Sequence, residues 1–260
     1  MDHCTLVRYR ALIAGIISLV SLLPPFSANL SHAAILNGGF ESDFTGWIKI
    51  GESFTETSEF GVEPTEGTYN ALLLTGAAED GELGSVSDST IESFLGLASG
   101  SLDTLIGADA IEGSIIGQTF TAKAGDYLSF DWNFLTNEAT SETEGFNDFA
   151  FVSVNSTVSK LADTFSSVFS SSTNEFDTET GFTTSSYSVT ADGTYTLGLG
   201  VLNTGDNTMG SGLLIDNVKL ENNGVSQPIV SVPEPSLVLG LLVFTAGGFG
   251  SALCKQQKRM

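Results

Sequence analysis

The sequence predicts an all-β sandwich with one short helical insertion, flanked by an N-terminal signal helix and a C-terminal membrane-length helix. Three observations predict the sandwich. Short runs rich in Val, Thr, Phe and Tyr recur between turn signals, and 29 glycines punctuate the chain. One run, Leu128–Leu135, alternates apolar with polar residues as a half-buried strand does, so Leu128, Phe130, Trp132 and Phe134 are predicted to face the core. About two hundred residues between the flanking segments suffice for one such sandwich.

The N-terminus carries a secretory pattern. Arg8 and Arg10 precede an apolar run from Ala11 to Leu23, and the small-residue pattern Ser31-His32-Ala33 follows. This order is typical of a signal peptide, which we expect at residues 1–33 with cleavage after Ala33. The alternative is an uncleaved anchor, but the apolar run is short for a membrane span. The chain is therefore expected to be exported.

The C-terminus carries a second targeting pattern. Val232, Pro233, Glu234 and Pro235 follow a polar linker at 223–231 and precede an apolar run at 237–253. Two prolines favour an extended entry, and the apolar run would reach roughly 25 Å as a helix, the short end of what spans a bilayer core. Lys255, Lys258 and Arg259 come next and favour a cytoplasmic end.

This tail, residues 232–260, resembles the PEP-CTERM sorting signal of exported bacterial proteins. The resemblance implies handling by an exosortase, a membrane transpeptidase, and delivery to the cell envelope or the extracellular matrix. It also implies membrane contact through the C-terminal segment before processing. Gln256 and Gln257 dilute the basic end and depart from the pattern. An ordinary single-span tail anchor is the alternative.

The body between the two signals has a composition that excludes several functions. Every Arg, His and Cys lies in a targeting segment, and four lysines stand against 30 acidic residues when Glu234 is included, a net charge of −26. Without cysteine or histidine, the body has no disulfide, thiolate nucleophile, imidazole base or zinc ligand set. With so few cations it cannot neutralise a phosphate backbone, so we expect no nucleic-acid partner.

Other segments of the body are predicted in order along the chain. Ser89–Ile106 has apolar residues at three- and four-residue spacing, which predicts a short helix, interrupted at Gly100, that caps one end of the sandwich. Ser166–Thr184 is rich in Ser and Thr and predicts a long exposed loop. Asp192-Gly193 predicts a hairpin turn. The remaining predicted strands are Tyr69–Thr75, Ser114–Lys123, Asn147–Val154, Tyr187–Thr190, Gly193–Leu202 and Gly212–Glu221.

The body opens with Asn37-Gly38-Gly39-Phe40-Glu41, followed by Gly46-Trp47. This opening resembles the first strand of galactose-binding-like jelly-roll domains, a group that includes many carbohydrate-binding modules. The resemblance implies a jelly-roll β-sandwich at 34–222. It also implies a structural calcium ion near the first and last strands, where Glu41 and Asp216 are the matching carboxylates.

The pattern of the last strand adds a reason to single out Asp216. By parity it shares a face with Leu214 and Val218, so its carboxylate requires either a bulge or a cation. Calcium binds six to eight hard oxygen ligands, which this acidic body supplies. Glu138 and Asp148 form a second candidate pair, and solvated surface carboxylates are the alternative for both pairs.

We expect a non-enzymatic secreted or cell-surface protein associated with extracellular polysaccharide. The first alternative is a carbohydrate-binding module. The second is a glycan-active hydrolase, which needs only a pair of carboxylates, but no spacing singles out a pair and no catalytic residue is predicted. Trp47 and Trp132 are both predicted to lie in the core, so neither is assigned to a sugar site.

Overall fold

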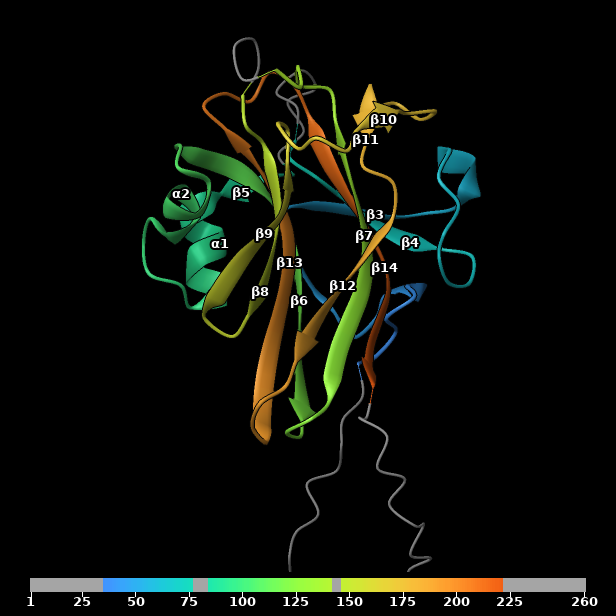
Figure 1. Cartoon of the computed structure of the whole chain (residues 1–260), viewed down its shortest axis with the longest axis vertical. Helices are drawn as coiled ribbons and strands as arrows, with labels where there is room; N and C mark the ends of the chain where they lie inside the picture. The colour runs from blue at the N-terminus through green and yellow to red at the C-terminus, as the bar shows by residue number, and fades with distance from the viewer. Residues whose placement is uncertain (1–34, 77–83, 142–145, 222–260) are drawn as a thin grey trace, which may run out of the picture.

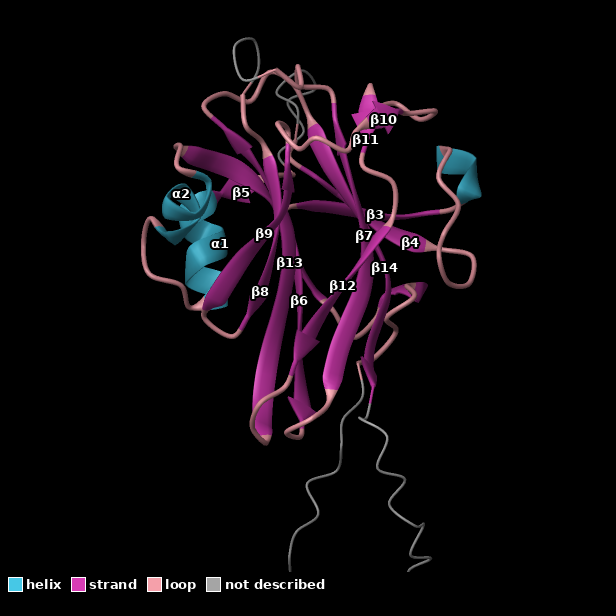
Figure 2. Ribbon diagram, in the orientation of Figure 1, coloured by secondary structure: helices cyan, strands magenta, loops and turns pink. Residues whose placement is uncertain are grey.

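The computed structural model describes residues 35–76, 84–141 and 146–221. Two antiparallel sheets pack face to face as a β-sandwich, and a pair of helices lies against one of them (Figure 1; Figure 2). The predicted all-β sandwich with a helical insertion is thereby confirmed. The predicted signal peptide, linker and sorting tail lie outside the described residues. Within those residues, no helix has both the length and the apolar character needed to cross a membrane.

Six strands form one sheet and seven form the other. The six-stranded sheet has the order β2 (Ile48–Ile50), β6 (Ala110–Ala122), β13 (Gly193–Thr204), β8 (Phe149–Val154) and β9 (Thr157–Asp163), with β5 (Val86–Ser87) also paired to β6. The seven-stranded sheet has the order β10 (Ser170–Ser171), β11 (Thr178–Glu179), β7 (Tyr127–Thr136), β14 (Ser211–Glu221), β4 (Asn70–Leu74) and β3 (Glu52–Glu56), with β12 (Thr183–Ser188) also paired to β7. Strand β1 (Glu41–Phe44) and the short 3-10 helix η1 (Ser58–Phe60) complete the element list.

The core lies between the two sheets and contains the side chains predicted by alternation. Leu128, Phe130, Trp132 and Phe134 of β7 are buried there, facing Tyr195, Leu197, Leu199 and Val201 of β13. Phe40 is fully buried although its φ of 56° is positive, and its ring lies 5.3 Å from that of Trp47. Both tryptophans are therefore core residues, as predicted.

Several consecutive strands cross from one sheet to the other, including β6 to β7, β12 to β13 and β13 to β14. The Asp192-Gly193 turn is one such crossing, so the predicted hairpin between its two flanking strands is wrong. Strand β12 pairs with β7, whereas β13 pairs with β6 and β8. The turn is held by the neighbouring crossing between β6 and β7, because the Asp192 carboxylate accepts the amide of Ala124 at 2.9 Å. Two crossings thus stabilise each other at one end of the sandwich.

The helical insertion covers a sheet face and does not cap an end of the sandwich, so that part of the prediction is wrong. Helix α1 (Asp88–Leu95) and helix α2 (Ser101–Ile106) pack on the outer side of the six-stranded sheet (Figure 2). Two glycines of this sheet allow the close approach. A Cβ atom at Gly117 would meet the Phe94 ring at 3.0 Å, and one at Gly198 would meet Leu95 at 2.5 Å.

The predicted loop at 166–184 contains structure that its composition did not indicate. Strands β10 and β11 lie within it, and Phe176 is buried against Leu72, Leu135 and Leu214 on the outer side of the seven-stranded sheet. Phe60 and Val62, which follow β3, pack on the same cluster. Segments from two distant parts of the chain therefore cover much of this sheet face.

Candidate functional site

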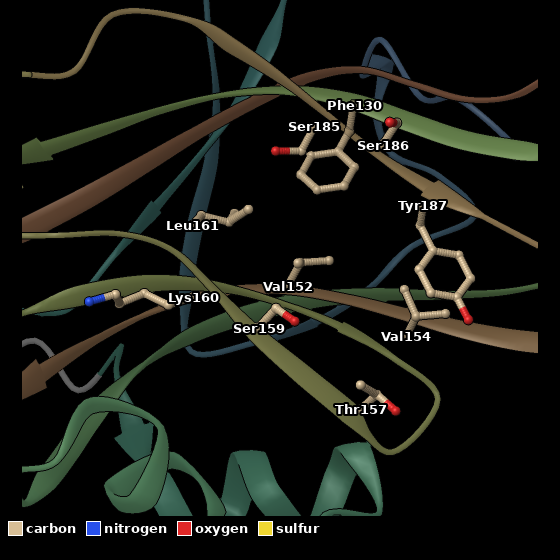
Figure 3. Close-up of a pocket in the computed structure, with 10 residues that line it drawn as sticks. All are labelled: Phe130, Val152, Val154, Thr157, Ser159, Lys160, Leu161, Ser185, Ser186 and Tyr187. Carbon is tan, nitrogen blue, oxygen red and sulfur yellow. The ribbon is translucent and has the colours of Figure 1, made fainter.

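A cleft opens where the two sheets part at one edge of the sandwich. Strand β9 ends the six-stranded sheet on this side, and β12 flanks β7 of the seven-stranded sheet. The space between them measures about 240 Å³ (Figure 3). We call this the edge cleft, and it is lined by Phe130, Val152, Val154, Thr157, Ser159, Lys160, Leu161, Ser185, Ser186 and Tyr187.

The edge cleft is accessible because several of its lining residues are exposed, among them Thr157, Ser159 and Ser186. The outer face of the six-stranded sheet is covered by α1 and α2, and the outer face of the seven-stranded sheet by the Phe176 cluster. A ligand that lay flat across either sheet would meet these segments first. Ligand pockets are concave and mostly apolar, with a few polar groups that fix orientation. The edge cleft has this character.

The chemistry of the cleft combines an apolar floor with hydroxyl groups. Figure 3 shows Val152, Leu161 and Phe130 around the opening and the Tyr187 ring at one side of it. Tyr187 is packed edge-on against Tyr195 with ring centroids 6.5 Å apart, which restricts its motion. The Ser185 hydroxyl is oriented by the Trp132 indole, which donates to it at 2.8 Å.

The charge of the cleft is small. Lys160 is its one cationic lining residue, and its ammonium group is paired with Asp163. None of the ten lining residues is Asp or Glu. Glycoside hydrolysis requires two carboxylates that flank the bond being cleaved. The edge cleft therefore has the groups for binding an uncharged polar ligand and lacks those for this hydrolysis.

Asp216 lies at a bulge, one of the two settings that the sequence predicted for it. The pairing of β14 with β7 shifts between Asp216 and Lys219, and Asn217 between them has a φ of 50°. The carboxylate is fully buried. Its Oδ2 accepts the amides of Thr65 and Glu66 at 2.7 and 2.8 Å, and its Oδ1 accepts the amide of Asn217 at 2.7 Å. Burial raises the pKa of Asp216, and these donors oppose that shift.

Glu41 binds the other end of the same loop. Its Oε1 accepts the amides of Thr68 and Tyr69 at 2.6 and 2.9 Å. The structure therefore brings Glu41 and Asp216 to one segment, 65–69, where both carboxylates accept backbone donors. Among the residues that the structure describes, no three Asp, Glu, His or Cys side chains gather as metal ligands. Calcium binding by this pair stays a prediction.

Glu138 and Asp148, the second predicted pair, lie at the end of the sandwich where β7 and β8 meet the loops. Asp148 is almost fully buried and Glu138 is largely so. Burial raises the pKa of Asp148 to about 7, and the negative charges of Glu138 and Asp206 add to the shift. Burial also raises the pKa of Glu138.

The edge cleft was missed by the sequence analysis for two reasons. Strand β12 reads Thr-Thr-Ser-Ser-Tyr-Ser, which has no alternation of apolar and polar residues, so its first part falls in the predicted loop. Strand β9 was not predicted either, because Val158 and Leu161 are its only large apolar side chains. The available signal was Tyr187, an aromatic residue next to a run of hydroxyl side chains.

Comparisons with known proteins give weak structural similarities and no family. No family model matches the chain, and no curated protein matches it. It is similar to a family 61 carbohydrate-binding module solved with β-1,4-galactotriose, at a TM-score of 0.41 and 14% identity over 74% of this chain and 99% of that one. A family 16 carbohydrate-binding module gives a TM-score of 0.32 and 15% identity over 72% of this chain and 97% of that one. A mannan-recognising family 27 module gives a TM-score of 0.33 and 14% identity over 70% of this chain and 91% of that one. Similarities this low carry no argument about the ligand.

Proposed function

We propose that the sandwich binds an uncharged carbohydrate chain in the edge cleft and does not cleave it. The observation that carries this proposal is the lining of the cleft: a restrained tyrosine ring and apolar floor beside four Ser and Thr residues, with no carboxylate. A sugar ring presents an apolar face and many hydroxyl groups, which match these two kinds of surface. The strongly acidic body disfavours polyanionic glycans by charge repulsion.

We propose further that the sandwich is a jelly roll of the galactose-binding-like kind, carried by an exported protein. The crossing of several consecutive strands between the sheets, such as β6 to β7 and β13 to β14, supports the first part. The signal pattern at 1–33 and the PEP-CTERM-like tail at 232–260 support the second. In this proposal an exosortase-type enzyme delivers a non-enzymatic protein to the envelope or matrix, where it associates with extracellular polysaccharide.

Substitution of Tyr187 is the test of binding. Wild type is first screened on a glycan array, and its affinity for the best neutral glycan is then measured by calorimetry. A central aromatic contact carries more than about 1.4 kcal/mol in many interfaces, so Tyr187→Ala should weaken binding by about tenfold or more. Tyr127→Ala is the matched control, because Tyr127 is exposed and does not line the cleft. Absence of saturable binding by wild type, or equal affinities for both variants, would contradict the proposal.

Processing of the tail makes a separate prediction. We expect the exported form to have lost Cys254 and Met260, because the short, glycine-containing apolar run at 237–253 makes a weak permanent anchor and the preceding prolines present an extended segment. The mature mass is measured in the native host for wild type and for Glu234→Ala. Retention of the complete tail in exported wild type would rule out processing and favour a permanent anchor.

A further inference from the structure

A layer of polar side chains closes one end of the space between the two sheets. Val201 of β13 and Ala150 of β8 are paired and both face the core. Two residues further along each strand, the same inner face carries Asn203 and Asp148, because side chains alternate along a strand. Directly opposed residues of antiparallel strands have Cβ atoms about 5 Å apart. Asn203 is therefore directed into the layer that contains Asp148.

The opposite sheet contributes hydroxyl groups to this layer. Thr136 of β7 and Ser211 of β14 are paired, and their hydroxyls lie 2.8 Å apart. The Ser211 hydroxyl donates to Asp148 Oδ2 at 2.7 Å, which joins the two sheets. The Thr204 amide donates to Asp148 Oδ1 at 2.9 Å. Each oxygen of Asp148 thus has one donor and retains capacity for another partner.

Asn203 lacks the partners that its burial requires. Asn203 is fully buried, and neither its Oδ1 nor its Nδ2 has a hydrogen-bond partner. The Thr204 hydroxyl is also without one, but Thr204 is paired with Ala110 of the outer-face cluster, so its side chain faces away from this layer. A buried polar group left unpaired costs about 1–3 kcal/mol, so the two side-chain atoms of Asn203 favour an additional partner in this layer.

Within the part of the chain that the structure describes, Asp148 has no ion-pair partner to balance a negative charge. Two of the lysines have other acidic partners, Lys160 being paired with Asp163 and Lys219 with Glu221. Glu138 and Asp206 add further negative charge close by. Glu138 is joined to the layer through its own amide, which donates to the Thr136 hydroxyl at 3.0 Å. The chemistry of the layer is therefore that of hard oxygen atoms with excess negative charge.

We propose that this layer binds a divalent cation of the calcium type through the Asp148 carboxylate and Asn203 Oδ1, with Glu138 as the second carboxylate. Calcium accepts carboxylate, amide and hydroxyl oxygens in irregular arrangements of six to eight ligands, with water in the remaining positions, whereas magnesium requires near-octahedral geometry. The site is separate from the Glu41–Asp216 pair, because Asp216 faces the outer side of the seven-stranded sheet and Asp148 faces the inner side. A cation here would bridge the two sheets at the end where the Asn137 amide donates to the Gly210 carbonyl.

The test is calorimetric titration of calcium and magnesium into the full chain in nonionic detergent, after treatment with a chelator. We expect saturable calcium binding that is tighter than magnesium binding. Glu138→Gln and Asn203→Ala should each weaken calcium binding by about tenfold or more, since even groups outside the ligand set of a metal carry about 10- to 100-fold in affinity. Glu41→Gln controls for the other candidate site, and Glu63→Gln controls for loss of an exposed charge.

Each outcome decides the proposal. Loss of affinity in Glu138→Gln and Asn203→Ala, with affinity kept in both controls, supports it. No calcium binding by wild type would overturn it and would leave water as the occupant of the layer. Loss of affinity in Glu41→Gln alone would overturn it in favour of the pair at the first and last strands. If Asn203→Ala does not fold, the isosteric Glu138→Gln variant still decides, with near-ultraviolet circular dichroism as the check of its fold.

Discussion

Asp216→Ala is expected to lower the free energy of unfolding by about 3 kcal/mol or more in the presence of a chelator. The substitution removes the acceptor of the Thr65, Glu66 and Asn217 amides. Hydrogen bonds to a charged group are worth about 1.5–3 kcal/mol each, and buried donors left unpaired cost about as much. The loop at 65–69 would lose one of its two anchors, the other being Glu41.

Denaturant unfolding of wild type, Asp216→Ala and the exposed control Glu63→Ala measures this effect. The comparison is repeated with calcium and with magnesium, because the sequence predicts that calcium stabilises the body through Glu41 and Asp216. A large loss in chelator would establish that Asp216 acts mainly by binding the loop. A loss of unfolding free energy seen only with calcium present would instead make metal binding the main role of Asp216. A loss below about 0.5 kcal/mol both in chelator and with calcium would contradict both roles.

Asp148→Asn is expected to stabilise the protein at about pH 8 and to have little effect near pH 4, again in chelator. Burial raises the pKa of Asp148 from 3.8 to about 7. The folded chain therefore retains this proton while the unfolded chain releases it. The stability that protonated Asp148 contributes is complete below about pH 4 and is lost as the pH rises through 7. A shift of this size corresponds to about 4 kcal/mol at most, at 1.36 kcal/mol per pH unit.

The asparagine side chain preserves the contacts of Asp148. Its Oδ1 can accept the Thr204 amide, and its Nδ2 can donate to the Ser211 hydroxyl, so the substitution removes the charge and keeps the geometry. Unfolding free energies of wild type and variant are compared at several pH values. An equal difference at low and high pH would show that Asp148 does not titrate in this range.

The main strands could be predicted because burial on one face imposes a period of two. Leu128, Phe130, Trp132 and Phe134 face the core for this reason. The bulge at Asp216 could be predicted from the cost of placing a carboxylate among aliphatic neighbours. Both arguments use only residues adjacent along one strand, which is the information that a sequence displays directly.

The features that the sequence did not predict depend on contacts between segments that are distant in the sequence. The Asp192-Gly193 turn has the residues of a hairpin, but its flanking strands find partners in different sheets, which no local pattern distinguishes. Phe176 lies in a Ser/Thr-rich segment, and its burial depends on Leu72 and Leu214 from strands far away in the sequence. The edge cleft depends in the same way on β9 and β12 meeting at one edge of the sandwich.

The most direct test of carbohydrate binding in the edge cleft is to map amide chemical shifts of the isotope-labelled protein during titration with the neutral glycan that binds best on the array. We predict saturable shifts concentrated on β9 and β12, with Ser159, Lys160, Ser186 and Tyr187 among the most affected, and little change at the loop 65–69. Shifts confined to the outer face of either sheet or to the loop 204–211, or the absence of any saturable shift, would contradict binding in the cleft.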